Sequence, residues 1–505
     1  MLREFQRKED GLSKEQRRER ISALRDKLTD QQLRVRDAKL PIIVLVEGWS
    51  ASGKGSLIND LIRDMDPRFF KMLSSPQTGE EQERYPFLYK FFSPLPANGN
   101  FLFVDSGWME ETVTRYIGGE IDEEEYLRRI ESCAVFERQL RDNGYVVIKL
   151  FLHISREEQQ KRLSELQSDR DTAWRVSESD LFQQREYKNF RREFDRFMEQ
   201  NSKSFPWHVI DAHSWKKKLY DAFLTITDGV EQALEQGRYV GRCQKELPDA
   251  AQARTFEECD LSLSVSDEEY RRELKKLKKK LTELHNKIYR AKIPVVICYE
   301  GWDAAGKGGN IRRLAAPLDP RGFDVIPIAA PTSEELARHY LWRFWTKLPR
   351  TGHVTIFDRT WYGRVMVERI EGFCAEDDWR RAYQEINEFE KELSDWGAVV
   401  LKFWIQIDPD TQLERFELRQ NTPSKQWKIT DEDWRNREKW PQYEEAVAEM
   451  LRKTSTDYAP WHVIPSVDKK YARLATLRIV VDAMEKALEA KADDTKQTEK
   501  GGDPE

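Results

Sequence analysis

The sequence carries the same long pattern twice, at a constant separation of 253 residues. An apolar segment followed by a glycine loop reads IIVLVEGWSASGKGS from residue 42 and VVICYEGWDAAGKGG from residue 295. A constant separation over most of a domain indicates duplication of a whole domain, and 505 residues are enough for two such domains. The separation holds for three pairs of residues: Lys54 and Lys307, Asp105 and Asp358, and Lys149 and Lys402.

Each copy has the pattern of an α/β domain. A charged helix is expected first, over 13–39 and over 267–292, and is followed by a β-branched strand, the glycine loop and another helix. A second strand ends in an aspartate (FLFVDSG and VTIFDRT), and a third follows (YVVIKLFLHI and AVVLKFWIQI). Apolar strands that alternate with helices predict a parallel sheet with helices on both faces.

The glycine loop of the second copy has the composition of a phosphate-binding loop, or P-loop. Residues 301–307 fit G-x-x-x-x-G-K, directly after an apolar strand and before a helix. Glycines allow successive backbone N–H groups to point at phosphate oxygens, the helix N-terminus adds partial positive charge, and the lysine reaches the distal phosphates. The predicted loop residues are Gly301, Ala304, Ala305, Gly306, Lys307 and Gly308.

The residue after the lysine departs from the usual P-loop. A serine or threonine that binds Mg²⁺ is common there, but this chain has Gly308, so a metal must depend on carboxylates. Asp358 ends the second strand, which is the position of the acidic Mg²⁺ residue in P-loop enzymes. Asp303 lies inside the loop and is the second candidate, because an acid that faces phosphate is repelled unless a cation or a transferable proton lies between them. A carboxylate that caps a turn is the alternative interpretation of Asp303.

Composition excludes several classes of protein. The chain is 34% charged, no apolar run reaches the ~18 residues of a membrane span, and its N-terminal segment has no apolar stretch of a signal peptide. Five scattered cysteines without a CxxC pair favour reduced, structural thiols in a cytoplasmic protein. A net charge of −6 and the absence of a reader motif argue against a nucleic-acid module. The KKLKKK run reads as a solvated face of a helix whose leucines form an apolar stripe, and this stripe could mediate assembly into a homo-oligomer.

Several motifs of the second copy resemble the polyphosphate kinase 2 family. They include EGWDAAGKGG, FDRTWYGRVMVER and PSKQWKI, in that order, and the resemblance runs from about Ile293 to Leu488. Two fused copies, and the glycine in WYGR, resemble the subgroup that transfers phosphate from polyphosphate to AMP, giving ADP. The resemblance implies an α/β kinase core with a helical lid, Mg²⁺ dependence, and polyphosphate and AMP or ADP as substrates.

The resemblance also implies roles for individual residues. Lys307 would hold the transferring phosphate, Asp303 and Asp358 would bind metal or orient the acceptor, and Arg359 would neutralise phosphate charge. A lid over 415–440 would line a polyphosphate channel with Arg415, Arg419, Lys425 and Lys428. Residues Thr332, Glu335, Arg343 and Arg364 would contact the acceptor nucleotide.

The first copy lacks much of this set. At the positions of Asp303 and Arg359 it has Ser50 and Ser106. Lys54 and Asp105 remain, so a weak phosphate site could persist. Because several cation positions are lost, we interpret the first copy as a structural or regulatory partner, with a second site of other chemistry as the alternative. Further replacements fall at Met109, Glu111, Leu166, Thr172 and Arg175, which take the places of Tyr362, Arg364, Arg419, Lys425 and Lys428.

The sequence therefore predicts two tandem P-loop kinase-like domains, each a parallel sheet flanked by helices. We place them at 1–235 and 266–491, separated by a linker at 236–265 and followed by a disordered tail at 492–505. Two other functions remain open: a nucleoside monophosphate kinase that uses ATP, and a nucleotide- or polyphosphate-binding protein without turnover.

Overall fold

The computed structural model describes residues 1–7, 11–74, 82–243 and 246–500. It divides into two compact units, each built mainly from one copy of the repeat. Unit 1 contains Met1–Gln82, Leu88–Gly241 and Thr332–Trp342, and unit 2 contains Glu83–Phe87, Arg242–Pro331 and Arg343–Glu505. Most of the segment that we expected to be a linker therefore belongs to unit 2.

Each unit has a five-stranded parallel sheet, and the two sheets have the same topology. The strand order is β2-β3-β1-β4-β5 in unit 1 and, in the same sense, β7-β8-β6-β9-β10 in unit 2. The strand that precedes each glycine loop is thus the central one, and ligands of such sheets bind outside the carboxyl ends of the strands. The strands are β1 Ile42–Gly48, β2 Phe70–Ser74, β3 Phe101–Asp105, β4 Val146–His153, β5 Trp207–Asp211, β6 Val295–Gly301, β7 Phe323–Pro327, β8 Val354–Asp358, β9 Val399–Gln406 and β10 Trp461–Pro465.

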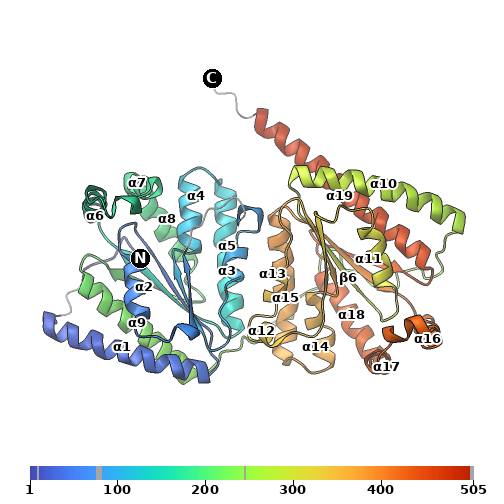
Figure 1. The fold of residues 1–505 in the computed structure, drawn as a ribbon, viewed down its shortest axis with the longest axis horizontal. Coiled ribbons are helices and arrows are strands. Elements are labelled where there is room, and N and C mark those ends of the chain that lie inside the picture. The colour runs from blue at the N-terminus through green and yellow to red at the C-terminus, as the bar shows by residue number, and fades with distance from the viewer. Residues whose placement is uncertain (8–10, 75–81, 244–245, 501–505) are drawn as a thin grey trace. The chain divides into compact units, whose positions relative to one another are not determined.

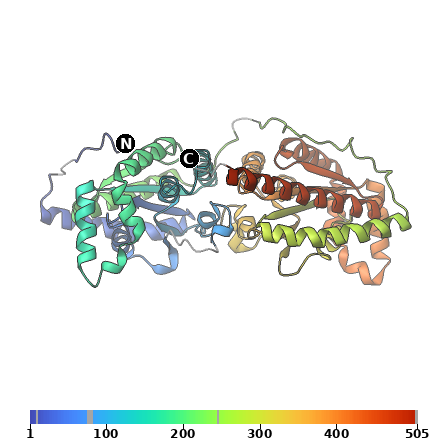
Figure 2. The ribbon, with the colours of Figure 1, turned by 90° about the horizontal axis from the view of Figure 1, so that it is seen from above.

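Helices pack on both faces of each sheet, as predicted (Figures 1 and 2). In unit 1 these are α1 Lys14–Asp37, α2 Lys54–Ile62, α3 Tyr89–Phe92, α4 Trp108–Ile117, α5 Glu123–Asp142, α6 Arg156–Ser168, α7 Glu178–Arg185, α8 Tyr187–Gln200 and α9 Trp215–Gln236. The second copy has α10 Asp267–Ala291, α11 Lys307–Ala315, α12 Ser333–Leu336, α13 Trp342–Trp345, α14 Val367–Ile370, α15 Glu376–Asp395, α16 Pro409–Gln420, α17 Asp431–Glu438, α18 Trp440–Thr454 and α19 Lys469–Lys500.

The first helix of each copy begins at a serine and packs along the last helix. Ser13 and Ser266 are the N-caps of α1 and α10, and each side chain accepts a hydrogen bond from a backbone N–H of the first turn. The predicted apolar stripe of α10 is confirmed, since Leu281, Leu284 and Ile288 are buried. The two helices α10 and α19 lie side by side in Figures 1 and 2.

The interior of each copy contains the same buried ion pair. Lys402 of β9 is fully buried and contacts Glu390 at 2.8 Å, and its ammonium group also donates to the Tyr362 hydroxyl at 2.8 Å. Lys149 of β4 pairs with Glu137 at 2.8 Å in unit 1. A buried pair is tolerated when further hydrogen bonds satisfy both charges. In unit 2 the pair therefore anchors the turn that carries Tyr362 beside β8.

The C-terminal segment differs from the sequence prediction. We expected disorder from residue 492, but α19 continues to Lys500. No proline or glycine occurs between 492 and 500 to end the helix, and Gly501 is the first residue that breaks the pattern. Residues 501–505 of the predicted tail lie outside the described residues.

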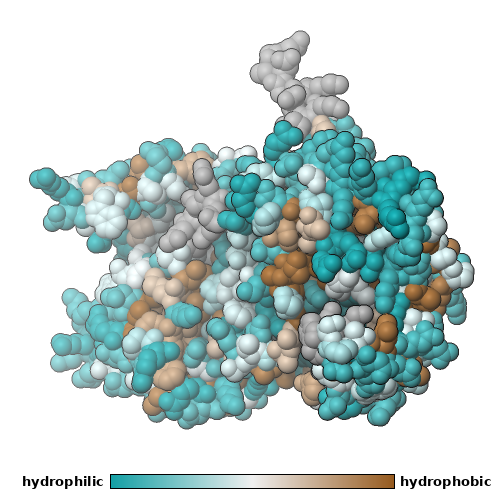
Figure 3. All heavy atoms as spheres, turned by 45° about the vertical axis from the view of Figure 1, so that its right-hand side comes forward, coloured by the Kyte–Doolittle hydropathy of each residue, from teal (hydrophilic) through white to brown (hydrophobic). Residues whose placement is uncertain are grey.

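The surface is rich in hydrophilic residues on the face shown in Figure 3, with separate hydrophobic residues among them. Among the described helices, none is both long enough and apolar enough to cross a membrane. All five cysteines are free thiols, and Cys133 and Cys298 are buried.

Candidate active site

The P-loop of the second copy joins β6 to α11 and depends on two glycines. Gly301 has a φ of 146°, and a Cβ atom there would lie 2.5 Å from the carbonyl oxygen of Ile405. Gly306 has a φ of 116°, which an L side chain rarely adopts. The Lys307 ammonium group lies over the loop and donates to the carbonyl oxygens of Gly301 at 2.5 Å and Trp302 at 3.2 Å.

Arg415 holds the loop from α16. Its guanidinium donates to the carbonyl oxygens of Ala304 and Ala305, both at 3.0 Å, and to those of Ser466 and Val467 at 2.6 and 3.0 Å. Burial lowers the pKa of Arg415 to about 10, and the side chain is only 8% exposed. We expected Arg415 to line a polyphosphate channel. Its donors are directed at backbone carbonyls and support the loop, while the side chain also lines the cleft described below, so its contact with polyphosphate stays a prediction.

Trp302, the second residue of the loop, lies in an aromatic cluster. Its indole N–H donates to Oε1 of Gln406 at 2.9 Å, and the indole of Trp404 donates to the same oxygen at 2.7 Å. The Trp302 ring stacks on Trp440 of the lid, with centroids 3.7 Å apart. The conformation of the loop is thereby linked to the end of β9 and to the start of α18.

The end of β8 brings charged side chains to the loop. Asp358 is the last residue of β8, and Arg359 follows with a φ of 67°. The Arg359 guanidinium lies 3.7 Å from Oδ1 of Asp303, whose Oδ2 accepts a hydrogen bond from Asn436 at 3.0 Å. A non-glycine residue in this region of φ is strained, and such strain is common at functional sites.

Glu300 fixes the turn that follows Arg359. The backbone N–H and the hydroxyl of Thr360 both donate to Oε1 of Glu300, at 2.7 and 2.8 Å. Burial raises the pKa of the Glu300 carboxyl, although the Lys307 charge opposes this shift. The turn and the loop are therefore joined by one buried carboxyl group.

These elements enclose a cleft of about 860 Å³ in unit 2. It contains Asp303, Lys307, Asp358 and Arg359, so the structure brings together the four predicted catalytic residues. Basic side chains outnumber acidic ones along its walls, which favours a polyanionic ligand even though the whole chain is acidic. The basic residues are Lys307, Arg312, Arg313, Arg359, Arg415, Arg419, Lys469 and Arg473.

Four of these cations were missed in the sequence: Arg312 and Arg313 of α11, and Lys469 and Arg473 of α19. Each occupies an ordinary helical position, and only the packing of α11 against α19 brings the four to one wall. A sequence signal was nevertheless present, because α11 follows the P-loop directly and its first turns must lie beside any bound phosphate.

The predicted lid consists of α16, the 3₁₀ turn Pro423–Lys428 (η5) and α17. Arg419 lines the cleft, as expected for a channel residue. The side chains of Lys425 and Lys428 lie outside the described part of the structure, so their role stays a prediction. Asn436 and Trp440, which contact Asp303 and Trp302, were not anticipated.

The predicted acceptor residues have local partners. Thr332 and Glu335 form the capping box of α12, which belongs to unit 1. Arg343 donates to the carbonyl oxygen of Ala329 at 3.0 Å, and Arg364 pairs with Glu368 at 2.6 Å. Contact of these four residues with a nucleotide stays a prediction.

A divalent cation would find two carboxylates in the cleft, Asp303 and Asp358. Across the described residues, no group of three or more His, Cys, Asp or Glu side chains could hold a metal ion. Mg²⁺ at phosphate sites is held by one or two carboxylates together with waters and substrate phosphates. The residues present therefore fit a metal that binds with its substrate, and Asp303 contacts side chains rather than capping a turn.

In the first copy, the P-loop lysine forms an ion pair with a glutamate. Lys54 lies 3.0 Å from a carboxylate oxygen of Glu110. Burial lowers the pKa of Lys54, but the carboxylates of Glu110, Asp105 and Glu47 together outweigh this effect and the net shift is upward. At the position of Glu110 the second copy has Gly363, which lines a cavity of about 90 Å³ together with Lys307. The sequence comparison overlooked this replacement.

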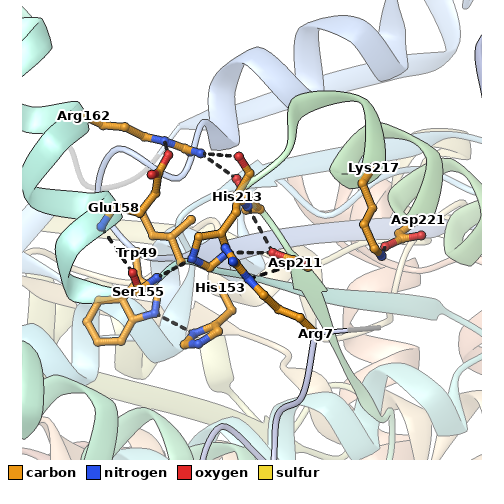
Figure 4. Close-up of polar contacts among 12 residues, drawn as sticks. Arg7, Trp49, His153, Ser155, Glu158, Arg162, Asp211, His213, Lys217 and Asp221 are labelled. Carbon is orange, nitrogen blue, oxygen red and sulfur yellow. Dashed lines mark hydrogen bonds and ion pairs between the residues drawn. The ribbon is translucent and has the colours of Figure 1, made fainter. Parts of the chain in front are cut away.

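The support of the loop is nevertheless the same in both copies. Arg162, at the position of Arg415, donates to the carbonyl oxygens of Ala51, Ala212 and His213 at 3.2, 2.9 and 3.0 Å. Figure 4 shows its guanidinium directed at the turn that carries His213. The first copy has thus kept the groups that hold the loop, and it lacks the counterparts of Asp303 and Arg359 although Lys54 and Asp105 remain.

Comparisons with known proteins agree with this division into two copies. The sequence model of the family "Polyphosphate kinase 2" matches residues 11–238 and again 264–492. Polyphosphate:AMP phosphotransferases from Pseudomonas syringae and Pseudomonas aeruginosa are 39% and 38% identical to the chain, covering 93% and 92% of it and 95% of each relative. A crystal structure of a polyphosphate kinase 2 from Pseudomonas aeruginosa has a TM-score of 0.82 at 35% identity, and covers 95% of this chain and 97% of its own.

Proposed function

The chain belongs to the polyphosphate kinase 2 family, and on this premise we propose that it transfers a phosphoryl group from inorganic polyphosphate to AMP, giving ADP. The observation that supports this most directly is the basic cleft around an intact P-loop in unit 2. Eight basic side chains on its walls suit a donor that carries a negative charge on every phosphate.

The reaction needs positioning and charge neutralisation more than covalent chemistry. An oxygen of the AMP phosphate attacks the terminal phosphorus of the chain, and the bond from that phosphorus to the bridging oxygen breaks. The polyphosphate leaves one phosphate shorter, with the electron pair on the former bridging oxygen. Lys307 and the loop N–H groups would hold the transferring phosphate, and Arg359 would neutralise charge that develops on it.

We assign Asp303 and Asp358 to a Mg²⁺ ion that would bind with the phosphates. When bound, such an ion neutralises phosphate oxygens and orients donor and acceptor. The contacts of Asp303 with Asn436 and Arg359 fix one of these carboxylates before substrate arrives. Removal of divalent cations with a chelator should therefore abolish turnover, and added Mg²⁺ should restore it.

The donor would extend from the P-loop along the basic wall. Arg312, Arg313, Lys469 and Arg473 are assigned to its more distant phosphates, together with Arg419 of the lid. The first copy is proposed to be non-catalytic, and the cytoplasm is proposed as the site of the activity, since the thiols are free.

Two alternative functions are distinguished from this one by the phosphate donor or by the absence of a reaction product. A nucleoside monophosphate kinase would require ATP, and a binding protein would form no product. The test is a screen of purified protein with Mg²⁺, in which polyphosphate or ATP is combined with AMP and products are separated by chromatography. We expect ADP from AMP and polyphosphate in the complete absence of ATP. Formation of ADP with ATP alone would favour the ordinary kinase.

Lys425 and Lys428 of the lid are predicted to act on the donor. Replacing both with glutamine should raise the KM for polyphosphate, and the effect should increase with chain length because a longer chain meets more of the channel. The measurement is KM for donors of several defined lengths at saturating AMP. The same loss at every length, or an effect on AMP alone, would show that these lysines do not line the channel.

A further inference from the structure

The segment between the two copies is attached to unit 2 along its length. The N–H groups of Ala250 and Gln252 donate to the carbonyl oxygens of Arg452 and Ser455 at 2.8 and 2.9 Å. The N–H of Val265 donates to Oδ2 of Asp468 at 2.9 Å, at the start of α19. We call residues 246–265 the strap. It behaves as part of the catalytic unit, in contrast to the linker that its composition predicted.

One aromatic residue of the strap reaches the cluster that holds the P-loop. The Phe256 ring lies 6.4 Å from the Trp404 ring, centroid to centroid. Trp404 and Trp302 donate to the same oxygen of Gln406, and their rings are in edge contact at 5.6 Å. A continuous series of contacts therefore runs from the strap to the second residue of the P-loop.

Unit 1 has an equivalent contact made by a different segment. Phe5, which precedes the first helix, packs edge-on against His153 with ring centroids 5.0 Å apart. His153 takes the place of Gln406, and its Nδ1 accepts the hydrogen bond from the indole N–H of Trp49 at 3.0 Å (Figure 4). In unit 1 the phenylalanine before the first helix contacts the residue that accepts the hydrogen bond of the P-loop tryptophan, whereas in unit 2 it contacts Trp404, which bonds that residue. Both phenylalanines lie outside the residues that the family model matches.

We propose that Phe256 is a positioning residue for the donor phosphate, acting through Trp404, Gln406 and Trp302. Trp302 belongs to the loop whose backbone N–H groups would face the phosphate. Its ring is in edge contact with Trp404 and stacks on Trp440. Loss of the Phe256 ring leaves Trp404 without that support and widens the range of loop conformations. The geometry of the N–H groups is thereby relaxed, which weakens the hold on phosphate without removing a charge. The proposal rests on the proposed function.

The test compares Phe256→Ala with Phe256→Tyr, which keeps the ring, and with Phe5→Ala, the matched change in unit 1. Because one aromatic contact is lost, we expect Phe256→Ala to raise the KM for tripolyphosphate about 3- to 10-fold. The KM for AMP and the melting temperature should stay close to those of the parent protein, since Phe256 is only half-buried. Phe256→Tyr and Phe5→Ala should leave the KM for tripolyphosphate unchanged.

Direct binding of tripolyphosphate in the absence of AMP, measured by calorimetry, separates this proposal from the proposed function. Weaker binding to Phe256→Ala supports the positioning role even if AMP proves to be the wrong acceptor. An unchanged affinity and an unchanged KM would overturn it. So would a lowered melting temperature with an unchanged KM, because that result describes a residue that only stabilises the fold.

Discussion

Replacement of Lys307 by alanine should lower the turnover number for ADP formation by at least ~100-fold, by analogy with the loss of one preorganised charge stabiliser. Lys307 already lies over the loop, where its ammonium group bonds two loop carbonyls. A bound phosphate would need only a small movement of this group. Initial rates at saturating polyphosphate and AMP measure the effect.

Asp358→Ala should cause a loss of the same order, because the variant removes one of the two carboxylates assigned to the metal. A matched control is Asp324→Ala, which changes an exposed aspartate of the neighbouring strand β7 that does not line the cleft. Near-normal turnover in Lys307→Ala or in Asp358→Ala would mean that the active site lies elsewhere.

Gly363→Glu should inactivate the second copy by reproducing the arrangement of the first. No atom lies within 4 Å of a Cβ placed on Gly363, so the backbone accepts a side chain there. In the first copy the glutamate at this position reaches the P-loop lysine, at 3.0 Å. A carboxylate in the same place would pair with Lys307 and repel phosphate, and we expect a loss of about 100-fold in kcat/KM for polyphosphate.

Gly363→Gln is the control for this variant, since glutamine has nearly the same volume without the charge. We expect Gly363→Gln to lose much less of its kcat/KM for polyphosphate than Gly363→Glu. The loss in Gly363→Glu should also become smaller at acidic pH, because the new carboxylate is then protonated. Equal losses in the two variants would indicate that the side chain blocks the cavity by its size, and the electrostatic explanation would then be wrong.

The sequence was sufficient to predict the duplicated α/β fold, because apolar strand patterns and the glycine loop are local features. The same holds for the convergence of Asp303, Lys307, Asp358 and Arg359: loop and strand ends must meet at the carboxyl edge of a parallel sheet. Contacts that depend on how a helix packs were not predictable in this way. The basic wall formed by α11 and α19 is one example, and the strap over 246–265 is another.

Arg415 shows a different limit. The sequence presents it as one more cation of the lid, yet its guanidinium bonds four backbone carbonyls. The position-by-position comparison could have revealed this, since the first copy keeps an arginine there while it loses the charges of Arg419 and Lys425. A residue that is retained in a copy without the chemistry is more consistent with support of the fold. The same comparison would have shown that Glu110 takes the place of Gly363.

We propose that only the second copy turns over. The decisive measurement is the initial rate of ADP formation from AMP and polyphosphate in Lys54→Ala, beside that of Lys307→Ala, in the full-length protein. Lys54 is already paired with Glu110, whereas Lys307 faces the basic cleft. We expect Lys54→Ala to keep most of the parent rate while Lys307→Ala loses nearly all of it. Equal damage from the two substitutions would contradict it, because both sites would then take part in catalysis.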